Sequence, residues 1–580
     1  MSISSTTVPL PARGAAKAAA TYWVDALLFA GLAALVAGTV GLARRWTAPL
    51  RPTVVIDLSV GALPVYTLYS LARGLAAYVL SLGFTLVYAT SAAHSRRAER
   101  VMIPVLDILQ GIPVLGFLPG LVLGMVALFP HSNVGLELAC VIMIFTGQAW
   151  NMTFSLYGSL RAIPTELREV AQVHRFGWWK RFRTLEVPSG MIGLVWNSMM
   201  SMAGGWFFLT VNEAFTLGDR DFRLPGVGAY MSVAIDHGDR GAMAGAVIAM
   251  MTMIVAVDQL LWRPALAWAQ KFKLEETSGT EAHESWVLNL VRRSRLLVWW
   301  QQLRSLRGAR ANGGRRVIGG TQVLVASAVQ LAMRGLGWLA GAAATLLVFW
   351  GVVHLLGLLT ALEAGEWLQL ATALTLTLLR TAGALLLGVL WTVPVGIWIG
   401  LSARRARLLQ PIIQVAAAFP APMLFPLVTL AMLAIGVDFA WGCTVLMLLG
   451  SQWYILFNVL AGATAMPQDL REAAAVYGLK GWARWRTLYM PAIFPQLVTG
   501  LITAAGGAWN ASIVAEYVRY RGRTLIAPGL GSLITEATAA ANFPLLAAGV
   551  LTMSLALVTL NRTVWRRLYR LADERFALNR

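Results

Sequence analysis

Long apolar runs constrain this chain more than any other feature of its sequence. Of its 580 residues, 58% are hydrophobic and 13% are charged, whereas roughly a quarter of the residues in a soluble domain are charged. A helix needs about 20 apolar residues to cross the hydrocarbon of a bilayer. About twelve such runs occur, six in each half, so the chain is predicted to be an all-α polytopic membrane protein. The predicted spans are 22–42, 68–91, 108–129, 134–157, 191–211 and 241–262, then 336–359, 374–401, 412–434, 439–460, 492–515 and 543–561.

The charge balance is interpreted as a signal of topology. The 47 Lys and Arg exceed the 27 Asp and Glu by 20, and basic residues favour cytoplasmic loops. Cytoplasmic N- and C-termini place most of these residues inside, so nucleic acid is not needed to explain the charge. The predicted domains are a cytoplasmic segment 1–20, a first half 21–262, a basic cytoplasmic linker 263–320, a second half 321–562 and a basic cytoplasmic tail 563–580.

The linker mixes Trp286, Trp299 and Trp300 with several arginines. That pattern predicts an amphipathic helix lying on an anionic lipid surface. The alternative is a soluble charged connector.

The sequence contains an internal duplication. Adding 303 to a position in the first half reaches a matching residue in the second, as with Pro164 and Pro467. Upstream the shift is 307, which pairs Arg73 with Arg380. Because six spans per copy would start and end each copy on the same side, the repeats are predicted to be parallel, related by an axis along the membrane normal.

The most informative segment is the cytoplasmic loop between the fourth and fifth spans of each half. In the second copy, Glu472, Ala473 and Ala474 favour a helix, and Gly478 permits a left-handed turn at its end. Basic residues then lead the chain back to the membrane before Pro491. A short helix held in this way can seat in a groove on a cytoplasmic partner and pass on its motion.

The order of Glu472, Ala473, Ala474, Gly478 and Pro491 along the chain resembles the signature loop of bacterial ABC-importer permeases. The sequence around this loop is similar to the nitrate, sulfonate and taurine branch of that family. The resemblance implies a type I importer permease fold with two halves fused, in the bacterial inner membrane. It also implies two separate ATPase subunits carrying ATP and Mg²⁺, and a periplasmic solute-binding protein. The solute implied is a small oxyanion such as nitrate, a sulfonate or taurine, or bicarbonate.

The first copy of the loop departs from the pattern. Glu169 and Ala171 are kept, but Arg175 stands where the glycine is expected, so the turn is predicted at Gly177. The two docking surfaces should then be unequal. The alternative is an ordinary basic, helical cytoplasmic loop without a docking role.

No nucleotide-binding or catalytic motif is found. A phosphate-binding loop needs a glycine before its lysine, and none of the five lysines has one. The six histidines show no i, i+4 pairing. The chain is therefore predicted to be a transport subunit without a cofactor of its own. The competing classes are an ion-coupled secondary carrier, which would need carboxylates near the bilayer midplane, and a membrane-embedded enzyme.

Ionisable residues inside a membrane suggest function by default. Arg73 and Arg380 lie near the starts of the second spans, and Glu213 and Glu516 end the fifth spans. They are predicted to form symmetric ion pairs that close an outer gate or shape the entrance. The alternative is that the arginines snorkel to the interface and the glutamates face external water.

Further candidates for the pathway lie beside these residues. Trp206 and Trp509 either line the pathway or belong to an aromatic belt, and Asp107, Gln110 and Gln414 begin the third spans, where prolines could free carbonyl groups or simply kink the helices. Four glycines of the outer loops are predicted to shape tight turns, namely Gly226, Gly228, Gly529 and Gly531.

Overall fold

The computed structural model describes residues 55–217, 220–272, 346, 349–520 and 523–576. The predicted first span, the helix predicted in the linker and the start of the span predicted at 336–359 lie outside the described residues. The described part is helical apart from two antiparallel ribbons, which join β1 (Thr216–Leu217) to β2 (Arg220–Asp221) and β3 (Tyr517–Tyr520) to β4 (Arg523–Ile526). The predicted all-helical architecture is confirmed, with these two ribbons added.

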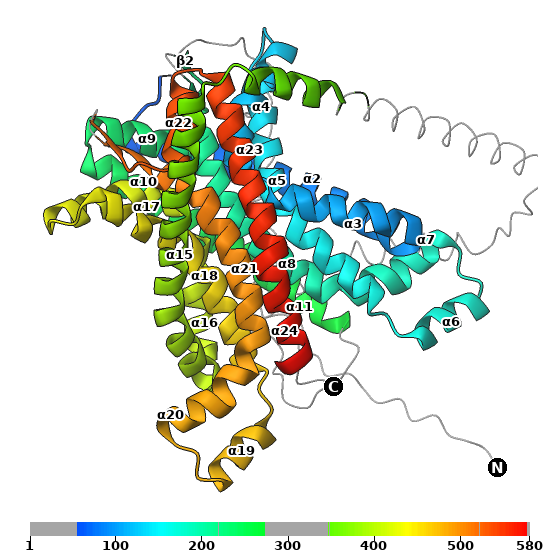
Figure 1. Cartoon of the computed structure of the whole chain (residues 1–580). Helices are drawn as coiled ribbons and strands as arrows, with labels where there is room; N and C mark the ends of the chain where they lie inside the picture. The colour runs from blue at the N-terminus through cyan, green and yellow to red at the C-terminus, as the bar shows by residue number, and fades with distance from the viewer. Residues whose placement is uncertain (1–54, 218–219, 273–345, 347–348, 521–522, 577–580) are drawn as a thin grey trace, which may run out of the picture.

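The helices follow in nearly the same order in both halves (Figure 1). The first half contains α2 (Leu63–His94), α3 (Arg96–Gly111), α4 (Leu118–Leu128), α5 (Val134–Arg161), α6 (Thr165–Val173), α7 (Trp178–Arg181), α8 (Val187–Glu213), α9 (Val227–His237), α10 (Arg240–Val257) and α11 (Arg263–Ala269). The second contains α15 (Ala364–Gly400), α16 (Ala403–Ala418), α17 (Ala421–Ala434), α18 (Phe439–Thr464), α19 (Gln468–Val476), α20 (Gly481–Arg484), α21 (Met490–Ala515), α22 (Leu530–Ala539), α23 (Phe543–Leu560) and α24 (Arg566–Phe576).

The duplication seen in the sequence is also present in the structure. Helices α19 and α23 repeat both ends of α6 and α10 at the offset of 303, and α16 repeats both ends of α3 at 307. Even the π-helical segments recur at 303, since Phe182–Glu186 corresponds to Trp485–Tyr489 and Asp258–Trp262 to Asn561–Trp565. Such segments are rare in helices, so their repetition supports two copies of one fold.

Seven helical stretches of the described chain are long and apolar enough to cross a membrane, or eight if the bent pair α16 and α17 counts as one span. Seven of the twelve predicted spans fall within these stretches. The predicted span 191–211 forms part of α8, a further helix of 27 residues. The seven stretches are Val60–His94, Val134–Arg161, Arg240–Phe272, Ala364–Gly400, Phe439–Thr464, Gly481–Ala515 and Phe543–Phe576.

The third predicted span of each half is broken into two helices, in agreement with the kinking that its prolines allowed. In the second half, α16 and α17 meet at an angle of 88°. In the first half, α3 ends at Gly111 and α4 begins at Leu118. Ile112 and Phe419 are extended at the two breaks, each directly before a proline, Pro113 or Pro420. Proline disfavours helical geometry in the residue before it and cannot donate a backbone hydrogen bond.

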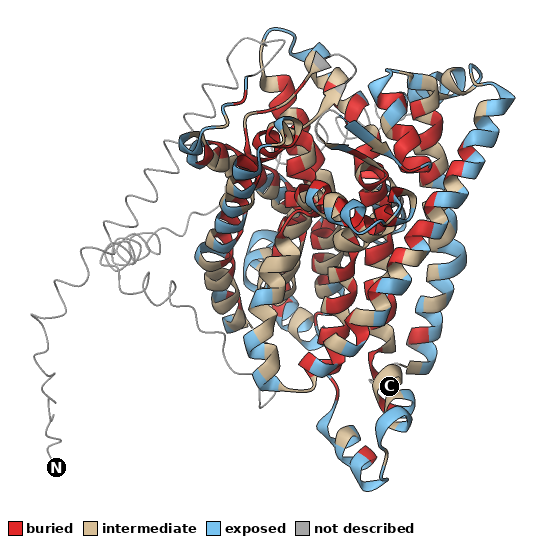
Figure 2. Ribbon diagram, turned by 90° about the vertical axis from the view of Figure 1, so that its left-hand side faces the viewer, coloured by how far each residue is buried: buried red, intermediate tan, exposed pale blue. Residues whose placement is uncertain are grey.

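Each half is organised around three packed helices, α2 with α5 and α8, and α15 with α18 and α21. Figure 2 shows buried residues concentrated in the middle of the bundle and exposed ones on its outer helices and hairpin tips. Small residues permit the close packing: a Cβ on Gly400 would lie 2.6 Å from that of Ala463 on α18. The two halves meet where α8 contacts α16 and α17, so the space between them is bounded by both copies.

Candidate functional site

A buried arginine links three helices of the first half. Arg73 on α2 donates from Nε and Nη2 to the Glu137 carboxylate on α5 at 2.6 and 2.7 Å, and from Nη1 to Glu213 on α8 at 2.7 Å. Nη1 also donates to the carbonyl of Pro225 at 2.9 Å. Arg73 and Glu213 are fully buried. Burying these charges requires such pairing, because an isolated ion loses its hydration at high cost.

The same carboxylate also holds the start of α9. Ser70 Oγ donates to Glu213 at 2.7 Å, and the backbone N–H of Gly228 donates to it at 2.9 Å. The N–H of Val227 in turn donates to Ser70 Oγ at 2.9 Å. The cluster therefore fixes the short outer helix α9 against α2 and α8.

The second half repeats this arrangement with one carboxylate fewer. Arg380 Nη1 donates to Glu516 at 3.0 Å and to the carbonyl of Pro528 at 2.7 Å, while its Nε donates to the carbonyl of Ala440 at 3.1 Å. Thr377 takes the place of Ser70 and donates to Glu516 at 2.8 Å. Ala440 occupies the position that corresponds to Glu137.

The sequence suggested four charged residues, and the structure joins them as one ion pair in each half. Arg73 pairs with Glu213 in the first half, and Arg380 pairs with Glu516 in the second. All four are buried, which excludes snorkelling arginines and water-exposed glutamates. None of them lines the two cavities found among the described residues. Each pair holds together helices of a single half, and neither spans the space between the halves.

Two of the four glycines predicted to shape turns, Gly226 in a turn and Gly529 in a bend, also permit a close approach of buried carboxylates. Gly226 and Gly529 have φ near 180°, which any residue can adopt. A Cβ on Gly226 would lie 2.3 Å from the Glu213 carboxylate, and one on Gly529 would lie 2.3 Å from that of Glu516. A side chain at either position would displace the carboxylate from its arginine.

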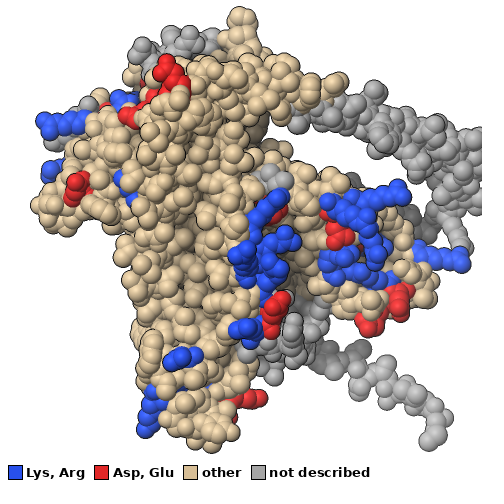
Figure 3. All heavy atoms as spheres, viewed as in Figure 1, with Lys and Arg blue, Asp and Glu red and all other residues tan. Residues whose placement is uncertain are grey.

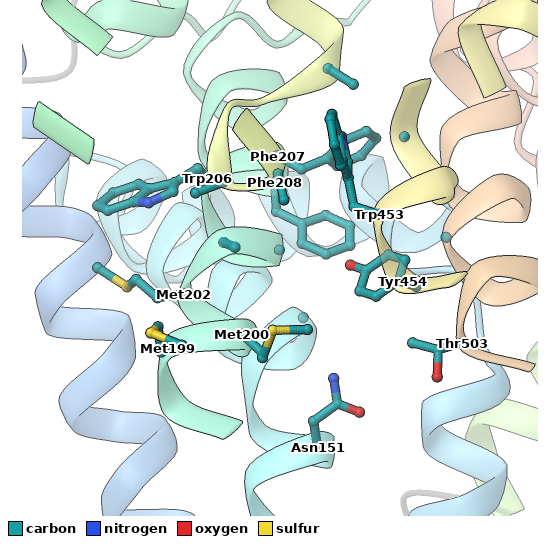
Figure 4. A pocket seen from close by; sticks show the side chains of 18 of the residues that line it. Asn151, Met199, Met200, Met202, Trp206, Phe207, Phe208, Trp453, Tyr454 and Thr503 are labelled. Carbon is teal, nitrogen blue, oxygen red and sulfur yellow. The ribbon is translucent and has the colours of Figure 1, made fainter. Parts of the chain in front are cut away.

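A cavity of about 190 Å³ lies between the two halves, in the middle of the bundle. Figure 4 shows Trp206, Phe208, Trp453 and Tyr454 around it, with Asn151 below. Most of its lining is apolar, with many aromatic and methionine side chains and a few amides and hydroxyls. Of the pathway residues suggested by the sequence, Gln110, Gln414 and Trp206 line this cavity. Asp107 and Trp509 do not, and Trp509 is buried within the helical core.

A polar contact crosses between the halves at the edge of the cavity. Gln414 Nε2 on α16 donates to Asp258 Oδ1 at 2.9 Å, and Arg263 Nε lies 3.1 Å from Asp258 Oδ2. Asp258 is buried. It is the one Asp, Glu, Lys, Arg or His among the described residues that line the cavity, and its charge is balanced by Arg263.

A second cavity, of about 290 Å³, lies one helical turn further toward the ribbons. It is lined by both halves, including Thr210 on α8, Ile513 on α21 and Arg519 on β3. Arg519 is exposed and pairs with no carboxylate in the described part of the chain. Arg223, which also lines this cavity, is paired with Asp236 at 2.9 Å.

The two loop helices suggested by the sequence are α6 and α19. Each begins directly after a proline and carries one buried alanine, Ala171 or Ala474. Ala474 packs with other buried residues at the base of α21, so α19 is anchored to the membrane helices. Both hairpins expose large apolar side chains at their tips, namely Val170, Val173, Trp178 and Trp179 in the first half and Val476, Tyr477 and Trp482 in the second.

Most side chains of these two helices are exposed. Glu169, Glu472 and Ala473 face outward, and Gln468 donates to Glu472 at 2.7 Å. Gly478 adopts the predicted left-handed conformation, with φ of 66°. In the first copy the same conformation is adopted by Arg175, with φ of 46°, while Gly177 is extended. The prediction that the turn moves to Gly177 was therefore wrong: Arg175 itself takes the strained geometry.

Several residues of the site were missed by sequence reasoning. Glu137 is an acidic residue within an apolar run, which is a usable signal, but it has no counterpart in the second copy. Asn151, Trp453 and Tyr454 carried no motif and were found through the cavity. No cluster of three or more His, Cys, Asp or Glu side chains suited to a metal occurs in the ranges that the structure describes.

Comparison with known proteins identifies the family. Residues 81–261 and 392–577, more than half of the chain, match the family described as binding-protein-dependent transport system inner membrane component. The chain is 29% identical over 154 residues to the nitrate import permease protein NrtB of Leptolyngbya laminosa, covering 27% of this chain and 52% of NrtB. It is 26% identical over 209 residues to the taurine transport system permease protein TauC of Escherichia coli K12, covering 35% and 72%. The chain thus spans about half of NrtB's length.

A further relative is the bicarbonate transport system permease protein CmpB of Synechococcus elongatus, 29% identical over 157 residues, which cover 27% of this chain and 54% of CmpB. Among solved structures, a chain of the MetNI methionine ABC transporter in an inward-facing conformation matches with a TM-score of 0.31 and 20% identity, covering 36% of this chain and 99% of that one. With the family matched in both halves, the chain belongs to the binding-protein-dependent transport system inner membrane components and is a permease component of an ABC transporter.

Proposed function

We propose that this chain forms the whole translocation pathway of an ATP-driven importer and that α6 and α19 dock onto two cytoplasmic ATPase subunits. Membership of the family implies an ATPase and a solute-binding protein as partners, and it implies a transport role in place of catalysis. One observation carries the proposal. Two equivalent hairpins, 303 residues apart, expose apolar side chains at their tips, and each carries one buried alanine, of which Ala474 packs against the base of α21.

The position of the central cavity suggests how docking would move the solute. Each hairpin follows a helix of the central core, α5 or α18, and leads through a π-helical segment into α8 or α21. A force on α6 and α19 would therefore reach the helices that line the cavity. ATP binding would favour one arrangement of the halves and hydrolysis another, which shifts the population between outward and inward access.

Charge supports a cytoplasmic location for this end of the molecule. Figure 3 shows Lys and Arg gathered toward the ends of the helices that carry α6 and α19. Basic residues favour the cytoplasmic side. In this orientation the ribbons and the second cavity face the periplasm, where a binding protein would deliver the solute, and both chain termini lie in the cytoplasm.

The identity of the solute is a separate question. The relatives are named for nitrate, taurine and bicarbonate transport, and these names support the expectation of a small oxyanion. Arg519 at the outer cavity would suit such a solute. The central cavity, which the solute must also pass, offers no cationic side chain among its described lining residues, and this weighs against a bare oxyanion.

A secondary carrier is the competing class. It requires carboxylates that can take up and release a coupling ion. The buried carboxylates Glu213, Glu516 and Asp258 each face an arginine at 2.7 to 3.1 Å, which leaves no free carboxylate among these three.

Copurification tests the proposed docking. The full chain would be isolated from its native membranes and the bound ABC ATPase quantified by mass spectrometry. Val170→Arg in α6 and Tyr477→Arg directly after α19 place a charge on each exposed tip. Val55→Arg, at another exposed position outside both hairpins, is the control. We expect loss of the ATPase with the tip variants together and no loss with the control. Retention of the ATPase by the double tip variant, with transport unchanged, would favour the carrier.

A further inference from the structure

We propose that the central cavity accepts an uncharged solute with a flat apolar body and hydrogen-bonding groups at its edge. This inference rests on the proposed role of the chain as the translocation pathway, and it narrows the class of solute. It depends on three properties of the described lining, which are its charge, its aromatic surfaces and its unused polar groups.

Charge argues against a bare anion at this point of the pathway. No Lys, Arg or His side chain belongs to the described lining, and its one carboxylate, Asp258, is balanced by Arg263 at 3.1 Å. Gln414 also has its amide N–H directed to Asp258. An ion that leaves water needs an opposite charge or several hydrogen bonds to replace its hydration, and without them the cost is several kcal/mol. A nitrate or sulfonate group would find no cation among the described lining residues.

The apolar lining favours a planar molecule. Phe207 and Phe208 on α8 and Trp453 on α18 present ring surfaces from opposite halves (Figure 4). Met199 and Met200 lie on the side facing Asn151. Aromatic rings stack with flat partners in offset or edge-to-face geometry, and methionine adapts its shape to the bound group. A single-ring solute would meet such surfaces on two sides.

Polar groups from both halves are available for the edge of the solute, and Gln110 also lines the cavity without a hydrogen bond to any described residue. The Asn151 amide on α5 and the Tyr454 hydroxyl on α18 form no hydrogen bond with any described residue, although both line the cavity. Thr503 and Asn510 differ, because Thr503 Oγ1 already donates to the carbonyl of Thr499 at 3.0 Å and the Asn510 amide contacts Val114 and Gly506. An amide and a hydroxyl together supply both donors and acceptors. They come from opposite halves, so a solute bound to both would bridge the two copies.

Ligand-observed saturation-transfer NMR on the full chain in lipid nanodiscs tests this assignment. The probes are nicotinamide, which is uncharged and carries an amide on one flat ring, and methanesulfonate, a small anion, at equal concentrations. We expect a signal from nicotinamide and none from methanesulfonate. Tyr454→Phe combined with Asn151→Leu should weaken nicotinamide binding by about tenfold, the loss of two ordinary hydrogen bonds. Thr535→Val, in the outer cavity, should leave it unchanged.

Three results would overturn the inference: no nicotinamide signal, an equal signal in the double variant, or a methanesulfonate signal that the double variant removes. Tyr454→Phe alone keeps the ring and guards against misfolding of the double variant. Copurification of the ATPase is measured on the same samples. Because the cavity variants lie away from α6 and α19, they should retain the ATPase whatever the probes show, so failure here stays distinct from failure of the docking proposal.

Discussion

Glu137 and Ala440 occupy corresponding positions beside the buried arginines Arg73 and Arg380, and only Glu137 brings a carboxylate. Arg73 therefore has two carboxylate partners, whereas Arg380 depends on Glu516 and on backbone carbonyls. The same fold thus tolerates two charge balances at one buried place.

This difference predicts unequal effects of removing a carboxylate. Glu516→Gln leaves Arg380 buried without a charged partner, and breaking a buried pair in this way costs about 3–5 kcal/mol. Glu137→Gln leaves Arg73 paired with Glu213, so its cost should be clearly smaller. The free energy of unfolding of each variant is measured in the same detergent, with tryptophan fluorescence as the signal, and compared with that of the unaltered protein. Equal losses would show that the second carboxylate matters as much as the first.

The close glycines predict a steric effect in the same region. Gly226→Ala and Gly529→Ala would each push a methyl group to 2.3 Å from a buried carboxylate, and overpacking of this kind costs about 1–3 kcal/mol. Gly120→Ala in α4 is the matched control, because its methyl group would meet nothing within 4 Å. Gly120→Ala should raise the free energy of unfolding of the protein by roughly 0.5–1 kcal/mol. Thermal unfolding separates the two outcomes, and a neutral Gly226→Ala would contradict the close approach.

The ends of α6 and α19 predict effects of opposite sign. Arg175 has a left-handed backbone, which costs a residue with a side chain roughly 1–2 kcal/mol. Arg175→Gly should therefore stabilise the first hairpin, and Gly478→Ala should destabilise the second by a similar amount. Proteolysis of the hairpins in membranes provides the measurement. Faster cleavage of Arg175→Gly would mean that the arginine side chain itself holds the turn.

The contact between Gln414 and Asp258 predicts sensitivity of the junction between halves to charge. Gln414→Glu would place a second carboxylate about where the donor now lies, 2.9 Å from Asp258 Oδ1. Repulsion should then lower the thermal midpoint, while Gln414→Met, which is similar in size and uncharged, should lower it less. Adding Asp258→Asn to Gln414→Glu removes the repulsion, so this double variant should regain the thermal midpoint that Gln414→Glu loses relative to Gln414→Met. If the double variant does not regain stability, repulsion between residues 414 and 258 is not the cause of the lowered thermal midpoint.

The proposed orientation predicts which positions are reached from each side of the membrane. Cys140 and Cys443 are buried, so single cysteines introduced elsewhere can be labelled selectively. Ala473→Cys on α19 should react with an impermeant maleimide only after the cell is opened, and Arg519→Cys on β3 should react in intact spheroplasts. The reverse pattern would place α6 and α19 in the periplasm and end the docking proposal.

Sequence reasoning found the features that depend on local pattern. The helical architecture, the two copies and the left-handed Gly478 all follow from apolar runs, a fixed offset and a glycine at a helix end. The helix breaks occur at Pro113 and Pro420, among the prolines noted at the starts of the third spans. The apolar runs nevertheless continue through these prolines. The prolines indicated possible kinks, but hydropathy averages over such a run and does not record a missing N–H, so the full break in the helix was not predicted.

Features that depend on side chains from distant segments were recovered less well. Arg73 and Glu213 could be matched by symmetry, but Glu137 could not, because it occurs in one copy alone. The lining of the central cavity is set by which faces of α5, α8 and α18 turn toward the other half. That depends on packing between helices far apart in the sequence, and no short motif encodes it.

Joining both copies in a single polypeptide has a consequence for how this protein can change over time. A permease assembled from identical subunits must alter both sides with every mutation. Here Arg175 and Gly478, or Glu137 and Ala440, have become different at equivalent places. Each half can therefore acquire substitutions suited to its own contacts. Because both halves are translated as one polypeptide, they are always produced in equal amounts.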